Sequence, residues 1–223
     1  MKQKLIIALF IVLFSTASFA QSIVGSKHDL SSGGGITDKS TNESQVCIFC
    51  HTPHQKAITA TPLWNKTLSS QASYGVYASG SFNATVADVG GASTVSNLCL
   101  SCHDGTVAVN SIDNKSSIGT PTMGATTELD ASGKIAAGRE ALIGTSLTND
   151  HPINFTYDAA LATADGGLVS PNSASYVDAA HTIPLYSSKV QCASCHNPHS
   201  NANSSFLRKA NNGSALCITC HNK

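Results

Sequence analysis

The arrangement of the eight cysteines constrains this sequence more than any other feature. All eight fall into four C-x-x-C-H motifs, which occupy residues 47–51, 99–103, 192–196 and 217–221. An even number of cysteines is also compatible with disulfides, and C-x-x-C pairs occur in zinc ribbons and redox-active dithiols. None of these alternatives requires a histidine after every second cysteine, so the motif must serve a different chemistry.

The C-x-x-C-H motif is the attachment sequence of haem c. Two thiols bond the porphyrin, and the adjacent histidine ligates the iron from the same side. The sequence therefore predicts four haem c groups and four iron ions. The covalent attachment residues are Cys47, Cys50, Cys99, Cys102, Cys192, Cys195, Cys217 and Cys220, and the proximal axial ligands are His51, His103, His196 and His221.

The sequences around the motifs indicate a duplication. The first motif continues as His51-Thr52-Pro53-His54 and the third as His196-Asn197-Pro198-His199. We predict a first dihaem unit over residues 21–110, a loop-rich insert over 111–189 that supplies a distal axial histidine, and a second dihaem unit over 190–223. The units are expected to form one compact domain around the haems. Weak patterns suggest a helix over 134–143 and a short hairpin within 76–89.

Only 6% of the residues are aromatic, so a core made of protein alone would be thin for this length. We expect the fold of a multihaem cytochrome c, with little regular secondary structure and with short helices and loops wrapped around four closely packed haems.

The N-terminus predicts export. Residues 1–20 combine Lys2 and Lys4, an apolar run and a small-residue cleavage site, as in a signal peptide. The apolar run is shorter than the roughly 20 residues that span a membrane, and no later stretch is apolar enough. Loss of both lysines leaves a net charge of −2, and no basic cluster exists to bind nucleic acid.

Five histidines remain as distal axial ligands for four irons. His54 and His199 each follow a proximal histidine by three residues, so both side chains of a pair point the same way and the second should reach a different haem. His151 and His28 each have an acidic neighbour that could orient the ring. His181 lacks one and is the least favoured, although which of His28, His151 and His181 is the spare stays open. The single methionine left after export favours histidine on both sides of every iron.

Several segments resemble the paired-CXXCH multihaem cytochromes of metal-reducing bacteria. They are residues 26–30, 50–54, 62–65, 99–106, 150–153, 190–199 and 217–223. Four haems in a chain of this size are similar to the OmcE-type extracellular cytochromes, which polymerise into filaments with a continuous haem stack. The resemblance implies a homopolymer in which His28 is donated to a neighbouring subunit.

We expect an electron-transfer protein of the cell exterior or cell surface, not an enzyme, which exchanges electrons with other redox proteins or an extracellular acceptor. The alternative is a multihaem reductase of a small oxyanion or nitrogen compound, which needs one iron with an open axial position. The four unmodified motifs and the excess of histidines favour electron transfer.

Overall fold

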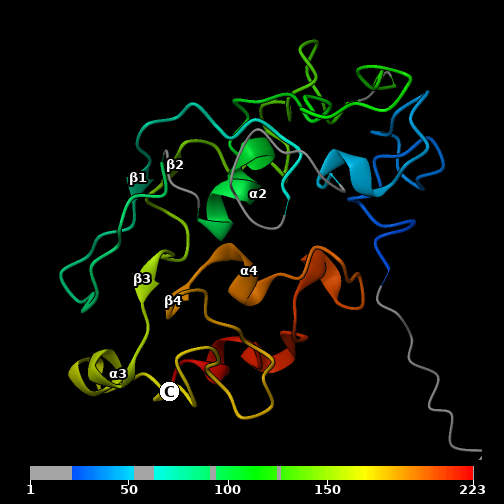
Figure 1. The fold of residues 1–223 in the computed structure, drawn as a ribbon. Coiled ribbons are helices and arrows are strands. Elements are labelled where there is room, and N and C mark those ends of the chain that lie inside the picture. The colour runs from blue at the N-terminus through cyan, green and yellow to red at the C-terminus, as the bar shows by residue number, and fades with distance from the viewer. Residues whose placement is uncertain (1–21, 53–62, 91–93, 125–126, 223) are drawn as a thin grey trace, which may run out of the picture.

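The computed structural model describes residues 22–52, 63–90, 94–124 and 127–222. The predicted signal peptide and His54 lie outside these residues. The described chain contains few and short regular elements (Figure 1). In chain order they are η1 (Cys47–Phe49), β1 (Gly75–Val76), α2 (Val95–His103), β2 (Ser146–Leu147), β3 (Phe155–Thr156), α3 (Ala159–Asp165), β4 (Lys189–Val190), α4 (Cys192–Cys195), η2 (Ser204–Phe206), η3 (Asn212–Ser214) and η4 (Cys217–Thr219). The expectation of little regular structure and short helices is confirmed.

α2 is the longest described helix, and its boundaries follow from its sequence. The Thr94 hydroxyl accepts a hydrogen bond from the Asn97 amide at 3.2 Å, which caps the N-terminus. Leu98 and Leu100 are buried, and His103 is the last helical residue. α2 therefore presents the second C-x-x-C-H motif on its C-terminal turns.

The four strands form two separate pairs. β1 pairs with β2 in parallel, so that Gly75 lies opposite Ser146. β3 pairs with β4 in antiparallel orientation, with Phe155 opposite Val190. The hairpin expected within residues 76–89 is wrong, because β1 finds its partner some 70 residues later in the insert.

The insert also differs from the expectation in its helical content. Residues 134–143 form turns instead of the predicted helix, and Gly138 adopts a φ of 77°, which interrupts a right-handed helix. The helix of the insert is α3, which follows Asp158 and ends at Gly166. The Asp158 carboxylate accepts a hydrogen bond from the Leu161 amide at 2.8 Å, and Gly166 adopts the left-handed conformation. These are the ordinary start and stop signals of a helix.

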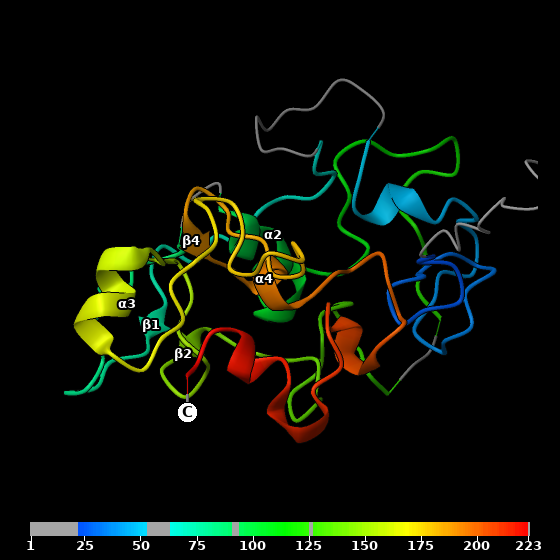
Figure 2. The same cartoon turned by 90° about the horizontal axis from the view of Figure 1, so that it is seen from below.

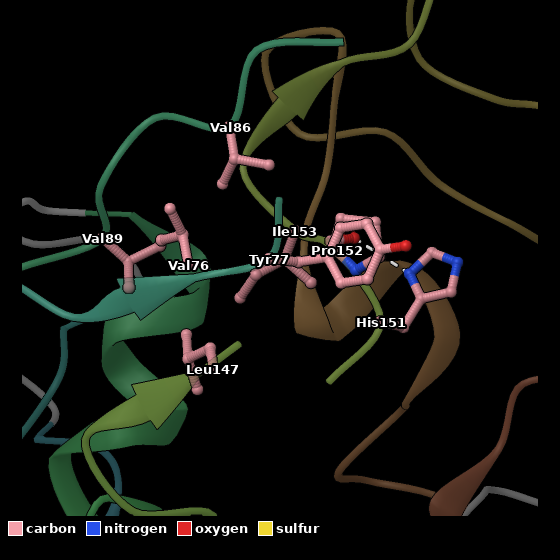
Figure 3. Close-up of a pocket in the computed structure, with 8 residues that line it drawn as sticks. All are labelled: Val76, Tyr77, Val86, Val89, Leu147, His151, Pro152 and Ile153. Carbon is pink, nitrogen blue, oxygen red and sulfur yellow. Dashed lines mark hydrogen bonds between the residues drawn. The ribbon is translucent and has the colours of Figure 1, made fainter. Parts of the chain in front are cut away.

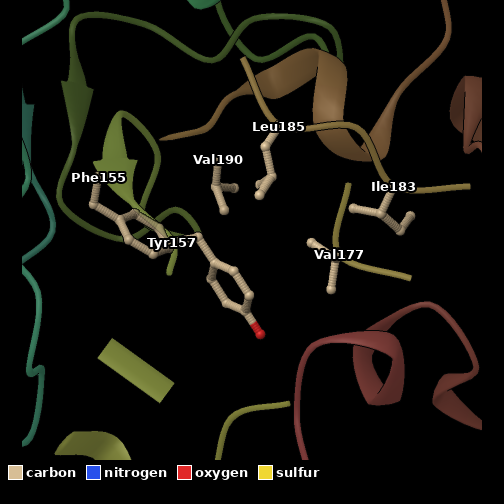
Figure 4. Packing of buried hydrophobic residues seen from close by; sticks show 6 residues of the cluster. All are labelled: Phe155, Tyr157, Val177, Ile183, Leu185 and Val190. Atoms are coloured by element: carbon tan, nitrogen blue, oxygen red, sulfur yellow. The ribbon is translucent and has the colours of Figure 1, made fainter. Parts of the chain in front are cut away.

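Among the described residues, three small clusters of buried apolar side chains take the place of one continuous core. The largest joins the insert to the C-terminal part of the chain (Figure 4), and consists of Phe155, Tyr157, Val177, Ile183, Leu185 and Val190. The second contains Tyr74, Val89, Leu100 and Leu147, and the third contains Ile48, Phe49 and Ile112. The insert contributes to all three clusters and thereby connects the two motif-bearing parts.

Two views of the ribbon show α2 and α4 side by side near the middle of the molecule (Figures 1 and 2). The second and third motifs, which are far apart in the sequence, are therefore neighbours in space. Among the described residues, none of the helices has the length and apolar character needed to cross a membrane.

Candidate functional site

Each C-x-x-C-H motif forms a short helical turn. The motifs lie on η1, the end of α2, α4 and η4. In three of them the histidine amide donates a hydrogen bond to the carbonyl of the first cysteine: His51 to Cys47 at 2.8 Å, His196 to Cys192 at 3.0 Å and His221 to Cys217 at 2.9 Å. A turn of this kind holds two thiols and one imidazole on a segment of five residues, as thioether attachment of a porphyrin requires.

The state of the cysteines in the structure can be compared with disulfides and zinc sites. All eight cysteines are free thiols. A zinc ribbon needs four converging ligands. Within the ranges that the structure describes, there is no group of three His, Cys, Asp or Glu side chains that could hold a metal ion.

The second and third motifs meet at their first cysteines. Cys99 of α2 and Cys192 of α4 are in hydrogen-bond contact, which raises the pKa of Cys99 and lowers that of Cys192. The buried Ser96 hydroxyl supports this contact, because it donates to the Gln191 side chain and accepts from the Cys192 amide at 3.0 Å. The second and third motifs, which are predicted to attach two haems, are thus adjacent.

The other motifs continue this series of neighbours. Burial raises the pKa of Cys50 to about 12, and Cys102 of the second motif adds to the rise. Burial also raises the pKa of Cys195, with contributions from Cys192 and then from Cys217 of the fourth motif. Cys50 of the first motif therefore lies near Cys102 of the second, and Cys195 of the third near Cys217 of the fourth.

Six histidine rings come together in three pairs. In each pair one ring belongs to a motif and the other to a predicted distal ligand: His28 and His103 with ring centroids 6.0 Å apart, His51 and His199 at 5.9 Å, and His151 and His221 at 6.4 Å. With metal–nitrogen bonds of about 2 Å, two imidazoles on opposite sides of one metal ion have centroids roughly 6 Å apart. All three separations match this value.

Backbone carbonyls orient three of the rings. Nδ1 of His103 donates to the Ala141 carbonyl at 2.7 Å, Nδ1 of His196 to Ser205 at 2.7 Å, and Nδ1 of His151 to Pro152 at 2.9 Å. A carbonyl can only accept, so Nδ1 of each ring carries a proton and Nε2 is the nitrogen left to bind a metal.

The surroundings of His28 favour the neutral form of its imidazole. Burial, followed by the neighbouring His103, lowers the pKa of His28 from 6.5 to about 4. Its buried Nδ1 has no hydrogen-bond partner among the described residues. The predicted role of Asp29 in orienting this ring is wrong, because the Asp29 carboxylate accepts hydrogen bonds from Gly25 and Ser31 instead. The N-terminal loop, closed by these bonds, carries His28 to His103 of its own chain.

His199 lies beside His51 of the first motif, although its own motif is the third. Burial lowers the pKa of His199, and His51 lowers it further. This placement agrees with a histidine that reaches away from its own motif. The equivalent histidine of the first motif, His54, lies outside the described residues.

His181 is placed differently from the other histidines. It is exposed, and within the described part of the chain its ring stacks on Tyr176 with centroids 4.4 Å apart and not on another histidine. The structure therefore does not bring His181 to a motif.

Several residues near the histidines were not identified from the sequence. An apolar pocket beside His151 is lined by Val76, Tyr77, Val86, Val89, Leu147, Pro152 and Ile153 (Figure 3). The Trp64 ring lies edge-on to His51 with centroids 6.0 Å apart, and the Phe206 ring stacks on His28 at 4.3 Å. Aromatic rings beside histidines suit contact with a porphyrin, and the donor set of thiols and imidazoles fits haem c.

Covalent attachment turns, neighbouring motifs and opposed imidazoles are the features of a multihaem c-type cytochrome. Residues 186–223, which include the third and fourth motifs, match the family of the doubled CXXCH motif. This match supports a multihaem c-type cytochrome with covalently bound haem and a role in electron transfer, and eight cysteines fit four haems. No curated protein matches the chain.

Proposed function

We propose that this protein is a tetrahaem cytochrome that transfers electrons through haems with two histidine ligands each. The proposal rests on the three opposed histidine pairs, with ring centroids 5.9–6.4 Å apart. The proposed ligand pairs, with the proximal histidine first, are His103 with His28, His51 with His199, and His221 with His151. We favour His54 as the distal ligand of the iron that His196 would hold. The reason is that His54 and His199 end the two copies of the duplicated His-x-Pro-His segment.

The protein chain would attach the haems, orient their histidine ligands and exclude a substrate from the iron. Each cysteine pair anchors one porphyrin edge, and carbonyls such as that of Ala141 hold the imidazoles in the tautomer that can ligate. Bound haem supplies the one-electron couple of its iron. Two histidines would hold each iron and would exclude a substrate from it, and ligation without methionine would favour low reduction potentials.

Neighbouring motifs support passage of electrons along the molecule. The contact between Cys99 and Cys192, and the proximity of Cys50 to Cys102 and of Cys195 to Cys217, bring successive attachment points together. His199 adds a second connection, because it follows the third motif and lies beside His51 of the first. An electron that enters at one motif therefore has a neighbouring acceptor at the next.

We further propose that the protein works outside the cell or at its surface, with redox proteins or an extracellular acceptor as partners. A homopolymer with His28 donated in trans is the form that the family resemblance favours. The placement of His28 beside His103 of the same chain instead supports donation in cis. Electron microscopy of the secreted protein distinguishes regular threads from separate particles.

The central proposal is tested by intact mass and by spectroscopy of the purified holoprotein. The mass should exceed that of the processed chain by four haems, and the ferric protein should be entirely low-spin. His199→Ala should convert one haem to the high-spin form, whereas the matched variant His181→Ala should leave all four low-spin. High-spin iron or carbon monoxide binding in the unmodified protein would favour the reductase alternative, and zinc or cystine in place of haem would refute both.

A further inference from the structure

The turn that follows the third motif has an unusual backbone. Ser205 and Phe206 are consecutive residues with φ of 52° and 58°, in the left-handed region that non-glycine residues seldom adopt. Such a conformation persists only where surrounding contacts hold it, and it often marks a functional position.

Hydrogen bonds to the third motif hold this turn. The Ser205 carbonyl accepts from Nδ1 of His196 at 2.7 Å, and the Phe206 carbonyl accepts from the Asn197 amide at 2.7 Å. The Arg208 amide donates to the Cys195 carbonyl at 2.8 Å. The backbone at Phe206 is therefore tied to the residues that surround one haem attachment point.

The Phe206 side chain faces a histidine of another motif's pair. Its ring stacks on the His28 ring, with centroids 4.3 Å apart and planes 16° from parallel. The His28 plane lies at 77° to that of His103, across the same pair. A ring stacked on one face of an imidazole resists rotation of that imidazole about the bond to its metal.

The turn that follows the first motif can be compared with the turn around Phe206. After the first motif, the Thr52 amide donates to the Leu63 carbonyl at 3.0 Å and the Asn65 amide to the Cys50 carbonyl at 2.8 Å, as in the turn around Phe206. Leu63 also adopts a φ of 58°. A leucine thus adopts the same left-handed φ at the position equivalent to Phe206, so this φ does not require an aromatic ring.

We propose that Phe206 is a positioning residue that sets the orientation of the His28 imidazole on its iron. This inference rests on the proposed ligation of haem by His28 and His103. In low-spin ferric haem, the angle between the two axial imidazole planes determines the splitting of the iron d orbitals. Near-perpendicular planes produce one strong low-field feature in electron paramagnetic resonance, and near-parallel planes produce a rhombic spectrum with three features.

The unmodified protein serves as the reference. The pairs of His28 and His151 have interplanar angles of 77° and 76°, whereas the pair of His51 and His199 has an angle of 17°. The oxidised protein should therefore show low-field features from the haems of His28 and His151, and a rhombic signal from the haem of His51 and His199. A holoprotein with four low-spin haems establishes the proposed function independently of any Phe206 variant.

The test compares Phe206→Leu, Phe206→Tyr and the control Leu63→Ala. Phe206→Leu installs the residue that the equivalent turn already carries, and the low-field intensity of one haem should be lost or shifted toward the rhombic region. Phe206→Tyr keeps the ring and should retain the original spectrum, as should Leu63→Ala. An unchanged spectrum in Phe206→Leu would overturn the inference. Loss of a haem from that variant, measured by intact mass, would also overturn it, because Phe206 would then be required for assembly.

Discussion

Replacement of Lys66 by methionine should destabilise this protein markedly, because within the described part of the chain the lysine is buried with backbone carbonyls as its partners and no carboxylate. Its side chain is 1% exposed, and Nζ donates to the carbonyls of Ala108 at 3.0 Å, Val109 at 3.0 Å and Ser111 at 3.2 Å. The ammonium group therefore fastens the segment after the second motif to the segment after the first.

The structure indicates the size of the effect. Methionine has a similar volume but no donor, so the three carbonyls lose a charged partner. The Ala108 carbonyl keeps a hydrogen bond from the Ser111 amide at 3.0 Å, which leaves two carbonyls most affected. At about 1–3 kcal/mol for each unsatisfied buried acceptor, and with some relief from no longer burying a charge, the free energy of unfolding should fall by about 3 kcal/mol.

Lys209→Met is the matched control. Lys209 follows the third motif as Lys66 follows the first, but it is partly exposed, and Thr219 is the one described residue to which its Nζ donates, at 3.0 Å. Its replacement should cost about 1 kcal/mol or less. Guanidinium denaturation of the holoproteins, followed by far-ultraviolet circular dichroism, measures both changes. Equal losses in the two variants would refute the reasoning.

The Lys66 ammonium also influences the first motif. Its positive charge lowers the pKa of Cys50 and so opposes the effect of burial, which raises that pKa. The charge of Lys66 therefore influences the electrostatic potential at the first motif. A nearby positive charge favours the reduced iron, and Lys66→Met should therefore lower the midpoint potential of one haem in a redox titration. Lys209→Met provides the comparison. Equal midpoint potentials for the haem of the first motif in both variants would contradict this assignment.

The remaining predictions concern the C-terminal part of the chain. Burial acts to raise the pKa of Asp178, but hydrogen bonds from two backbone amides outweigh it and hold this pKa below its ordinary value of 3.8. The carboxylate therefore stabilises the fold above pH ~4, and this contribution is lost as the pH falls through the folded pKa. Asp178→Asn should make acid unfolding, followed by circular dichroism, less steep. The buried Tyr157 hydroxyl donates to two carbonyls, one of them that of Cys220 at 3.1 Å, and Tyr157→Phe should lower the unfolding free energy by about 1–2 kcal/mol in guanidinium denaturation. Because His181 stacks on Tyr176 and not on another histidine, Tyr176→Ala should leave the spin state of every haem unchanged in the visible spectrum, and appearance of a high-spin band would show that this stacked pair supports a haem ligand.

Sequence patterns predicted the chemistry of this protein because that chemistry is encoded within short segments. A C-x-x-C-H motif occupies one helical turn, and a turn is determined by residues that are close together in the chain. The low content of regular structure could also be predicted, since Gly, Ser, Thr and Asn fill the regions between motifs. α3 could have been found from Asp158 and Gly166, which are ordinary capping residues at its two ends.

The sequence by itself determined which residues can attach haem and which histidines are available to ligate it. Only the tertiary structure decided which histidines meet: His28 lies beside His103, and His199 lies beside His51, across 75 and 148 residues of chain. It also decided that Phe206 covers His28 and that Lys66 is buried. Local patterns carry no information on such pairs, because contacts between distant segments depend on how loops without regular structure pack together.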